Sequence, residues 1–302
     1  MENKMTIQNN IQPTMSVSLF GGEVRVDAFG REYGQNFSFM GIDGSKDSHA
    51  THAPIFAALG SISSKSNYFA PSPIHMNAEV VTPDDFKYSR GHKQWTLPFS
   101  ENAYLHRGVC ADGLSELSPS QGFVMSAADC ALVVVRCDEI TIAAHAGRDS
   151  VIDMLFMKGE AQEMRKSVVD NICEIVSSEG GDLQKLKVWI GFSISAGSHF
   201  EHVVNSTAYP HNKKLVEFVS KEYGAECFKD DGQGGALGWL DLKKLIRQQF
   251  IQRGVREQDI ELDSVCTCCD TREGKPIWYS NRRQQVNRES QNRNLIAVTV
   301  NE

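Results

Sequence analysis

Apolar and polar positions along this chain divide it into strand-like and helix-like segments. The clearest strand pattern is a pair of apolar runs at residues 131–135 and 140–144, built from the β-branched and small residues that fill buried sheets. The pattern predicts further strands at residues 16–20, 23–28, 37–40, 74–81, 186–190, 260–265, 278–279 and 295–300. Gly21 and Gly22 predict a hairpin turn between the first two of these.

Apolar residues at helical spacing predict helices between the strands, at residues 50–59, 150–177, 213–223 and 241–253. Because strands and helices alternate over the whole length without a repeat or a linker, the pattern favours a single α/β domain. We expect mixed β-sheets layered between helices. Residues 1–15 are rich in Asn, Gln and Thr, so we expect a disordered tail there and the domain at residues 16–302.

Composition adds limits to this picture. The 302 residues are 41% hydrophobic and 23% charged, as in an ordinary globular protein with a sizeable core. A net charge of -7 argues against nucleic acid as a partner, because phosphate binding needs a basic face. The sequence shows neither a bilayer-length apolar run nor a signal-peptide pattern, which predicts a cytoplasmic protein with reduced cysteines and no membrane partner.

Two reactive side chains flank the central pair of strands. Cys130 precedes the first strand, and His145 follows the apolar run of the second. A thiol and an imidazole on rigid strands suit either a metal site or a nucleophile with its base, although a cysteine at a strand end is most often a small buried residue. Asp129 precedes Cys130 and faces the other way unless the backbone turns, so we expect it to orient a neighbour or transfer a proton.

A second cysteine cluster, Cys266, Cys268 and Cys269, lies near the C-terminus. Its spacing could begin a metal knuckle, but no second Cys/His pair follows at zinc-finger spacing. A structural role is therefore favoured for these three cysteines.

Several segments, in order, resemble the laccase-domain, or polyphenol-oxidase-like, family of zinc-dependent purine nucleoside enzymes. They are residues 73–81 with His75, 126–131 with Cys130, 143–148 with His145, 241–243, 253–255, 266–269, 278–283 and Arg293. The resemblance implies a layered α/β fold and one zinc ion per chain, held by His75, Cys130 and His145. A set of two histidines and one thiolate fits an open catalytic site, in which water or substrate takes the fourth position.

The resemblance also implies an activity: phosphorolysis of adenosine, inosine or methylthioadenosine, together with deamination of adenosine. Zinc lowers the pKa of its water to about 7, which provides hydroxide for attack on a purine ring. Besides the two ligands Cys130 and His145, we expect Asp129 and Arg148 in the catalytic group. The candidates for binding substrate or phosphate are Arg148, Arg282, Arg283 and His199, because guanidinium groups bind phosphate in a bidentate manner.

The expected partners are purine nucleosides and phosphate, and the oligomeric state stays open. The chain departs from the family pattern where Arg148-Asp149 replaces Trp-Arg and where residues 190–201 lack two cysteines. His106 competes with His75 as the first ligand, because it lies closer to Cys130 in the sequence.

Two other functions stay open. One is a metal-free cysteine hydrolase or deamidase with Cys130 as nucleophile and His145 as base. The other is a catalytically silent relative that serves as a binding or regulatory module, which the lost cysteines favour. Copper-dependent phenol oxidation fits less well, because it needs several histidine-rich copper sites and the nine histidines are scattered.

Overall fold

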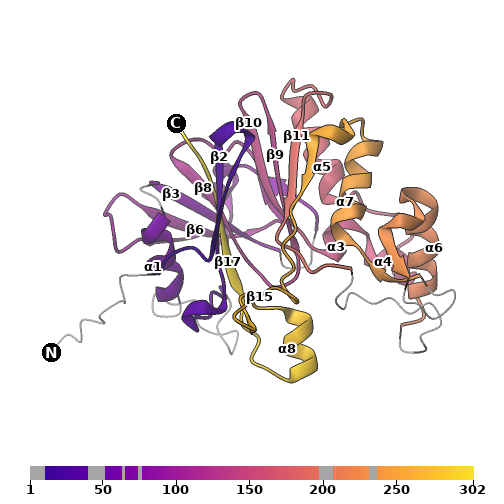
Figure 1. Ribbon diagram of the computed structural model, residues 1–302. Helices are drawn as coiled ribbons and strands as arrows, with labels where there is room; N and C mark the ends of the chain where they lie inside the picture. Colours follow the sequence, from indigo (N-terminus) through magenta and orange to yellow (C-terminus); the bar gives the residue numbers. More distant parts are fainter. Residues whose placement is uncertain are drawn as a thin grey trace.

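Two mixed β-sheets form the centre of the molecule (Figure 1). This computed structural model describes residues 11–39, 52–62, 65–73, 77–196, 207, 209–230 and 237–302. The seven-stranded sheet has, in spatial order, β1 (Met15–Leu19), β2 (Val24–Phe29), β17 (Asn294–Val300), β8 (Gln121–Ala127), β3 (Asn67–Ser72), β6 (Tyr104–Cys110) and β5 (Lys93–Thr96). The six-stranded sheet has β14 (Ile260–Leu262), β11 (Lys187–Gly191), β9 (Ala131–Cys137), β10 (Ile140–Ala146), β7 (Gly113–Leu114) and β4 (Val80–Val81).

The larger sheet joins the two ends of the described chain. β2 and β17 pair antiparallel, and β3 runs parallel to both β6 and β8. In the smaller sheet, β11 and β14 are parallel, as are β4 and β7, whereas β9 and β10 form an antiparallel hairpin. Because strands from both ends of the chain share one sheet, the described residues form a single α/β domain, as the sequence predicts.

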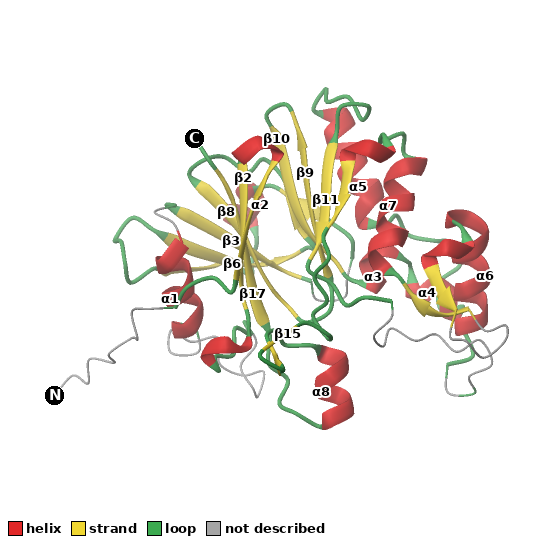
Figure 2. Ribbon diagram, in the orientation of Figure 1, coloured by secondary structure: helices red, strands yellow, loops and turns green. Residues whose placement is uncertain are grey.

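Most helices lie on the outer sides of the two sheets, whereas the helix at residues 83–88 packs into the core between them and the helix at residues 281–287 lies beyond the ends of the strands (Figure 2). Their bounds are α1 (Ala53–Ile62), α2 (Pro83–Tyr88), α3 (Arg148–Val151), α4 (Met154–Lys158), α5 (Val168–Ser178), α6 (Asn212–Tyr223), α7 (Leu242–Gln252) and α8 (Asn281–Asn287). Two small ribbons complete the fold: β12 (Phe228–Asp230) with β13 (Leu237–Leu240), and β15 (Thr271–Arg272) with β16 (Lys275–Pro276). Among the described helices, none has the length and apolar character needed to cross a membrane.

Alternation along the strands distributes apolar side chains among three cores. On β9, Leu132 and Val134 pack between the two sheets, against residues such as Phe123 of β8. Val133 and Val135 point to the opposite face, where α5 and α7 cover the smaller sheet and α6 packs against α7. The α1 helix covers the outer face of the larger sheet. This order of layers confirms the prediction of mixed sheets layered between helices.

The prediction of one helix over residues 150–177 is wrong. Asp153 begins α4, because its side chain accepts hydrogen bonds from the backbone N–H groups of Leu155 and Phe156. Gly159 then ends α4 with a left-handed φ of 79°, and Ser167 begins α5 with a capping box. Local capping side chains therefore divide an apolar pattern that by itself looks continuous.

Other differences occur where strands are short or lie at the margins of apolar runs. Residues 37–39 and 278–279 contain no strand, and of the described residues 77–81 only Val80–Val81 forms one. The sequence pattern missed β3, β6 and β8. Residues 11–15 of the predicted tail belong to the fold, because Ile11 is buried and the Thr14 N–H bonds to the Ala28 carbonyl. Residues 1–10 lie outside the described residues.

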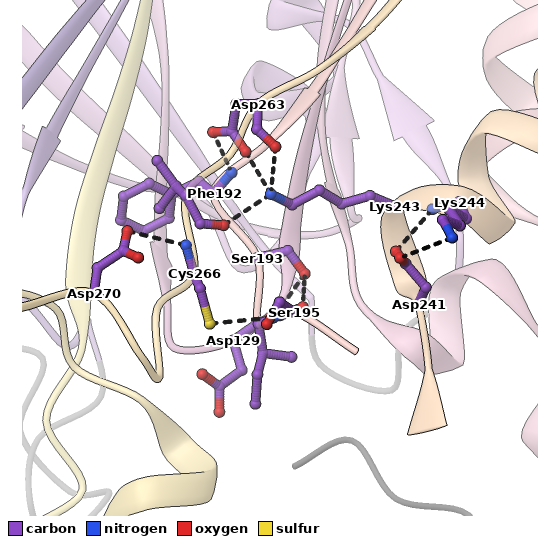
Figure 3. A network of polar contacts seen from close by, with 12 residues as sticks. Asp129, Phe192, Ser193, Ser195, Asp241, Lys243, Lys244, Asp263, Cys266 and Asp270 are labelled. Carbon is purple, nitrogen blue, oxygen red and sulfur yellow. Dashed lines mark hydrogen bonds and ion pairs between the residues drawn. The ribbon is translucent and has the colours of Figure 1, made fainter. Parts of the chain in front are cut away.

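A buried ion pair ties α7 to the loop that follows β14 (Figure 3). Lys243 Nζ donates to the Asp263 carboxylate and to the backbone carbonyls of Asp263 and Val265. The same carboxylate accepts the N–H of Phe192 at 2.9 Å, just after β11. The Lys243 side chain is only 9% exposed, whereas that of its neighbour Lys244 is 50% exposed.

We expect Lys243→Met to lower the free energy of unfolding by about 3 kcal/mol, because it leaves the Asp263 charge buried without its cation. Urea denaturation monitored by circular dichroism measures this loss. Lys244→Met, on the exposed face of the same helix, is the matched control and should change stability by less than about 0.5 kcal/mol. Equal effects of the two substitutions would contradict the assignment.

Candidate metal and catalytic site

The β9–β10 hairpin brings Cys130 and His145 together. Its register pairs Ala131 with Ala146 and Leu132 with His145. One step beyond the last pair, Cys130 and Gly147 come opposite each other at the open end of the hairpin. The hairpin therefore places the thiol and the imidazole side by side, although they are well separated in the sequence.

Gly147 shows how closely the two reactive groups approach. A Cβ atom added there would lie 3.2 Å from Cys130 Sγ, 3.2 Å from His145 Nε2 and 2.9 Å from His145 Cε1. The backbone of Gly147 has an ordinary extended conformation, with φ -71° and ψ 164°, so conformational freedom is not the reason for the glycine. Glycine is needed there because the sulfur and the ring nitrogen occupy the space of a side chain.

Asp112 orients the histidine ring. It lies directly across from His145 beyond the start of β7, and its carbonyl accepts the His145 N–H at 2.8 Å. The carboxylate is 1% exposed and lies 2.9 Å from His145 Nδ1, and it also accepts bonds from Ser150 Oγ at 2.8 Å and the Ala78 N–H at 2.8 Å. With Nδ1 bound to Asp112, Nε2 faces Cys130 and can serve as the ligand or proton-transfer atom. The sequence reasoning missed Asp112, because nothing in its local pattern marks it.

The charges of the site act strongly on the histidine. Burial by itself lowers the pKa of the His145 imidazole, but the charge of Cys130 and hydrogen bonds to Asp112 and Cys130 outweigh it and raise the pKa to about 10. The bonds to Asp112 and Cys130 thus favour a proton on His145. A metal ion at Nε2 would take the place of that proton.

Asp129 lies in the short crossing from β8 in the larger sheet to β9 in the smaller one. Its φ of 81° turns the backbone there. Its carboxylate accepts bonds from Thr267 Oγ1 at 2.7 Å, Ser280 Oγ at 3.1 Å and the Arg282 N–H at 2.7 Å. Its carbonyl accepts the N–H of Ile194 at 3.1 Å. The described contacts thus make Asp129 an anchor that positions Cys130.

With this geometry in place, sequence comparison identifies the relatives of the chain. The sequence model of a family described as multi-copper polyphenol oxidoreductase laccase matches residues 62–297, most of the chain. The chain belongs to this laccase family. None of the curated proteins compared with it matches in sequence.

Solved structures of low sequence identity share the fold of this family member. The hypothetical protein YfiH of Bacillus licheniformis is 17% identical, with 92% of each chain covered and a TM-score of 0.62. Protein NMB0706 of Neisseria meningitidis is 14% identical over 93% of this chain and 95% of its own, with a TM-score of 0.58. YlmD of Geobacillus stearothermophilus is 18% identical over 78% and 74%, with a TM-score of 0.53. At these identities the likeness concerns the fold alone.

Two of the predicted arginines lie near the site. Arg148 is the first residue of α3, directly after Gly147, and its Nε donates to Asp149 at 2.8 Å. The two residues that depart from the Trp-Arg pattern of the laccase family thus pair with each other. Arg282 donates its backbone N–H to Asp129, which places it beside the crossing that carries Cys130.

Arg283 is used differently. Its guanidinium donates to the backbone carbonyl of Cys268 at 2.8 Å and to that of Trp278. A longer contact of 3.4 Å reaches the Thr267 carbonyl. Because these bonds hold the 266–269 turn against the start of α8, we do not assign Arg283 to phosphate.

Arg293, quoted for the resemblance but not proposed as a site residue, lies close to the reactive thiol. Burial lowers the pKa of its guanidinium, while the charges of Cys130 and Asp129 raise it. The residue precedes β17, and its backbone N–H is held by the Asn36 side chain at 3.1 Å. Because Asn294 of β17 pairs with Ala127 of β8, Arg293 comes next to the crossing that carries Asp129 and Cys130.

Of the candidate histidines that the structure describes, His145 lies at the site and His106 lies away from it. His106 lies on β6, where its Nε2 contacts Asn67 Oδ1 at 3.0 Å and its Nδ1 contacts His92 Nε2 at 3.1 Å. Its ring stacks on Phe69 with centroids 4.7 Å apart. Within the described part of the chain, no three His, Cys, Asp or Glu residues form a metal-binding group, so His106 does not join Cys130 and His145. His75 and His199 lie outside the described residues.

We expect His106 to make folding pH-dependent. Burial, followed by the charges of His92 and Lys87, lowers its pKa from 6.5 to about 4. Between pH 4 and pH 6.5, the unfolded chain therefore binds more protons than the folded chain. The contribution of neutral His106 to the free energy of unfolding is present above pH 6.5 and is lost as pH falls toward 4. His106→Asn should flatten that part of the pH profile of the urea midpoint. An unchanged slope between pH 6.5 and 4 would contradict this origin.

Proposed function

We propose that the chain is a zinc-dependent enzyme that cleaves purine nucleosides with phosphate and also deaminates adenosine. The observation that carries this proposal is the convergence of Cys130 Sγ and His145 Nε2 beside Gly147. A thiolate and an imidazole are preferred donors of zinc. The Asp112 carboxylate on His145 Nδ1 matches the support that metal-binding histidines usually receive. Cys130 Sγ and His145 Nε2 are therefore two donors that fit a zinc ion.

The third ligand in this proposal is His75. Ala78, three residues later in the chain, donates its N–H to the same Asp112 carboxylate that holds His145. The described segment that follows His75 in the sequence is therefore bonded to the group that orients His145. With His75, Cys130 and His145 as ligands, the fourth position of a tetrahedral zinc ion is open to water or substrate.

The residues around the thiol and the imidazole suit an anionic substrate. In phosphorolysis, a phosphate oxygen bonds to ribose C1′ while the bond from C1′ to the purine nitrogen breaks, and the base leaves after gaining a proton. Arg293, Arg282 and Arg148 would bind and orient the phosphate. Asp129 would hold the Cys130 crossing rigid. When bound, zinc would supply a Lewis acid for either reaction.

Copper chemistry, which the family description names, has less support from the described histidines. Multicopper oxidation requires several histidine-rich sites. Instead, the His52 ring packs edge-on against Phe56 and Trp95, and His106 stacks on Phe69. Cytoplasmic location and the absence of nucleic-acid and membrane partners belong to the proposal, as expected from charge and sequence pattern.

The direct test incubates the purified protein with adenosine and inorganic phosphate. We expect adenine and ribose-1-phosphate, with inosine from deamination, and we expect chelation to abolish these products and added zinc to restore them. Chromatography of the products measures the reaction, and a phenolic substrate with copper serves as a parallel assay. Chelator-sensitive phenol oxidation without nucleoside turnover would overturn the proposal.

Two cysteines at opposite ends of β9 provide matched variants. Cys130→Ala should lose both bound zinc and nucleoside turnover. Cys137→Ala, a buried residue at the far end of the same strand, should keep one zinc ion per chain. Element analysis of the two folded variants measures the difference. Equal zinc content in both would exclude Cys130 as a ligand.

Asp112→Asn should weaken zinc binding about 10-fold to 100-fold, because it removes the charge that holds the His145 ring. Competition with a chromogenic chelator measures the affinity. Asp153→Asn is the control, because Asp153 is likewise buried and accepts backbone N–H bonds, but it caps α4. Its zinc affinity should stay within about threefold of the parent, and a comparable loss in both variants would point to a general effect on folding.

One observation favours a second function, a metal-free cysteine hydrolase or deamidase. Cys130, His145 and Asp112 stand in the order of a nucleophile, its base and the group that orients the base. This alternative predicts rapid alkylation of Cys130 by iodoacetamide in the protein as purified, with no bound metal. Stoichiometric zinc that protects Cys130 from alkylation would exclude it.

A further inference from the structure

The 266–269 turn carries three cysteines that the proposed reaction does not use. Two of them, Cys266 and Cys269, have the C-x-x-C spacing found in redox-active thiol pairs. Cys266 is 5% exposed, Cys268 is half-buried and Cys269 is exposed. An oxidant in solution therefore reaches the exposed Cys269 before the buried Cys266.

The turn geometry brings the spaced pair together. The Asp270 N–H donates to the Cys266 carbonyl at 3.0 Å, which closes one helical turn, and the Asp270 carboxylate accepts the Cys266 N–H at 3.0 Å (Figure 3). In such a turn, residues three apart lie on the same side. The Cys269 N–H donates to Cys266 Sγ at 3.3 Å, so the buried sulfur already lies against the backbone of Cys269.

The buried sulfur is also in a setting that suits a thiolate. The N–H of Ser195 donates to Cys266 Sγ at 3.3 Å (Figure 3), and the bond from Cys269 is a second one. Two amide donors stabilise the negative sulfur more than the neutral thiol. Cys266 is therefore prepared to attack an oxidised neighbour.

Cys268 is the weaker partner for Cys269. Adjacent Cα atoms are about 3.8 Å apart, shorter than the separation of about 4.4–6.8 Å that unstrained disulfides show. Burial raises the pKa of the Cys268 thiol, and the charge of Asp129 raises it further, although a hydrogen bond with Ser280 acts the other way.

We propose that Cys266 and Cys269 are an oxidation site that forms a reversible disulfide with hydroperoxides. The Cys269 thiol attacks one peroxide oxygen, the O–O bond breaks, and a sulfenic acid and one molecule of water (or alcohol) are formed. The Cys266 thiolate then attacks the Cys269 sulfur, the S–S bond forms, and hydroxide leaves as a second water after taking a proton. A dithiol reverses the reaction by exchange.

Thr267, which lies between Cys266 and Cys269 in the sequence, connects the oxidation site to the proposed active site. Thr267 donates to the Asp129 carboxylate at 2.7 Å, and Asp129 adjoins Cys130. In the same turn, the Cys268 carbonyl accepts a hydrogen bond from the Arg283 guanidinium at 2.8 Å. Neither Cys266 nor Cys269 is a candidate zinc ligand, so the disulfide does not require the proposed enzymatic function.

A single tryptic peptide allows a direct test. Cleavage after Arg256 and Arg272 releases residues 257–272, which contain these three cysteines and no other. The full-length protein is treated with a small excess of hydrogen peroxide, unfolded and alkylated with iodoacetamide in guanidinium chloride, digested and analysed by mass spectrometry. We expect this peptide to gain one alkyl group, on Cys268, instead of three, and to gain all three after prior reduction with dithiothreitol.

Two serine variants separate the pairings. Cys268→Ser should still oxidise and gain no alkyl group, whereas Cys269→Ser should gain two after the same treatment. Circular dichroism of each variant checks that it is folded. Three alkyl groups in the oxidised parent, a disulfide to Cys268 or Cys130, or conversion of Cys269 to sulfinic acid in place of the disulfide would each overturn the proposal.

Discussion

The buried Asp112 carboxylate is the constraint on which the candidate site depends. It accepts bonds from the His145 ring, the Ser150 hydroxyl and the Ala78 backbone, and so joins three separate segments of the chain. A buried carboxylate is costly unless its oxygens are hydrogen-bonded, and these donors and the His145 charge compensate that cost. The same bonds leave one nitrogen of His145 directed at Cys130. Stability and chemistry therefore rest on one side chain.

Asp129 plays the corresponding part on the other side of Cys130. The chain passes there from one sheet to the other, and a positive φ at Asp129 makes the crossing short. Hydroxyl and amide donors from Thr267, Ser280 and Arg282 hold it in place. The C-terminal segments of the laccase family motif thus act on the reactive thiol mostly through Asp129. Redox chemistry in the 266–269 turn would act on the thiol by the same route.

Family membership and site geometry lead to complementary conclusions. Membership shows what kind of fold the chain has, while low identity to the solved structures leaves the reaction to be argued from the residues. The Cys130–His145–Asp112 arrangement serves a zinc ion or a covalent nucleophile equally well in outline. Zinc content therefore decides between the two chemistries more directly than any further contact in the fold.

The sequence by itself determined much of the architecture and half of the site. Apolar patterns located β9 and β10, which are continuous apolar runs buried on both faces, and α6 and α7, which bury one face at helical spacing. The flanking motifs identified Cys130 and His145. Only tertiary structure decided what surrounds them: strand pairing between distant segments places Asp112 on the His145 ring and brings the charge of Arg293 to act on Cys130. Local pattern records which face of a strand is buried, whereas the partner across the sheet depends on topology.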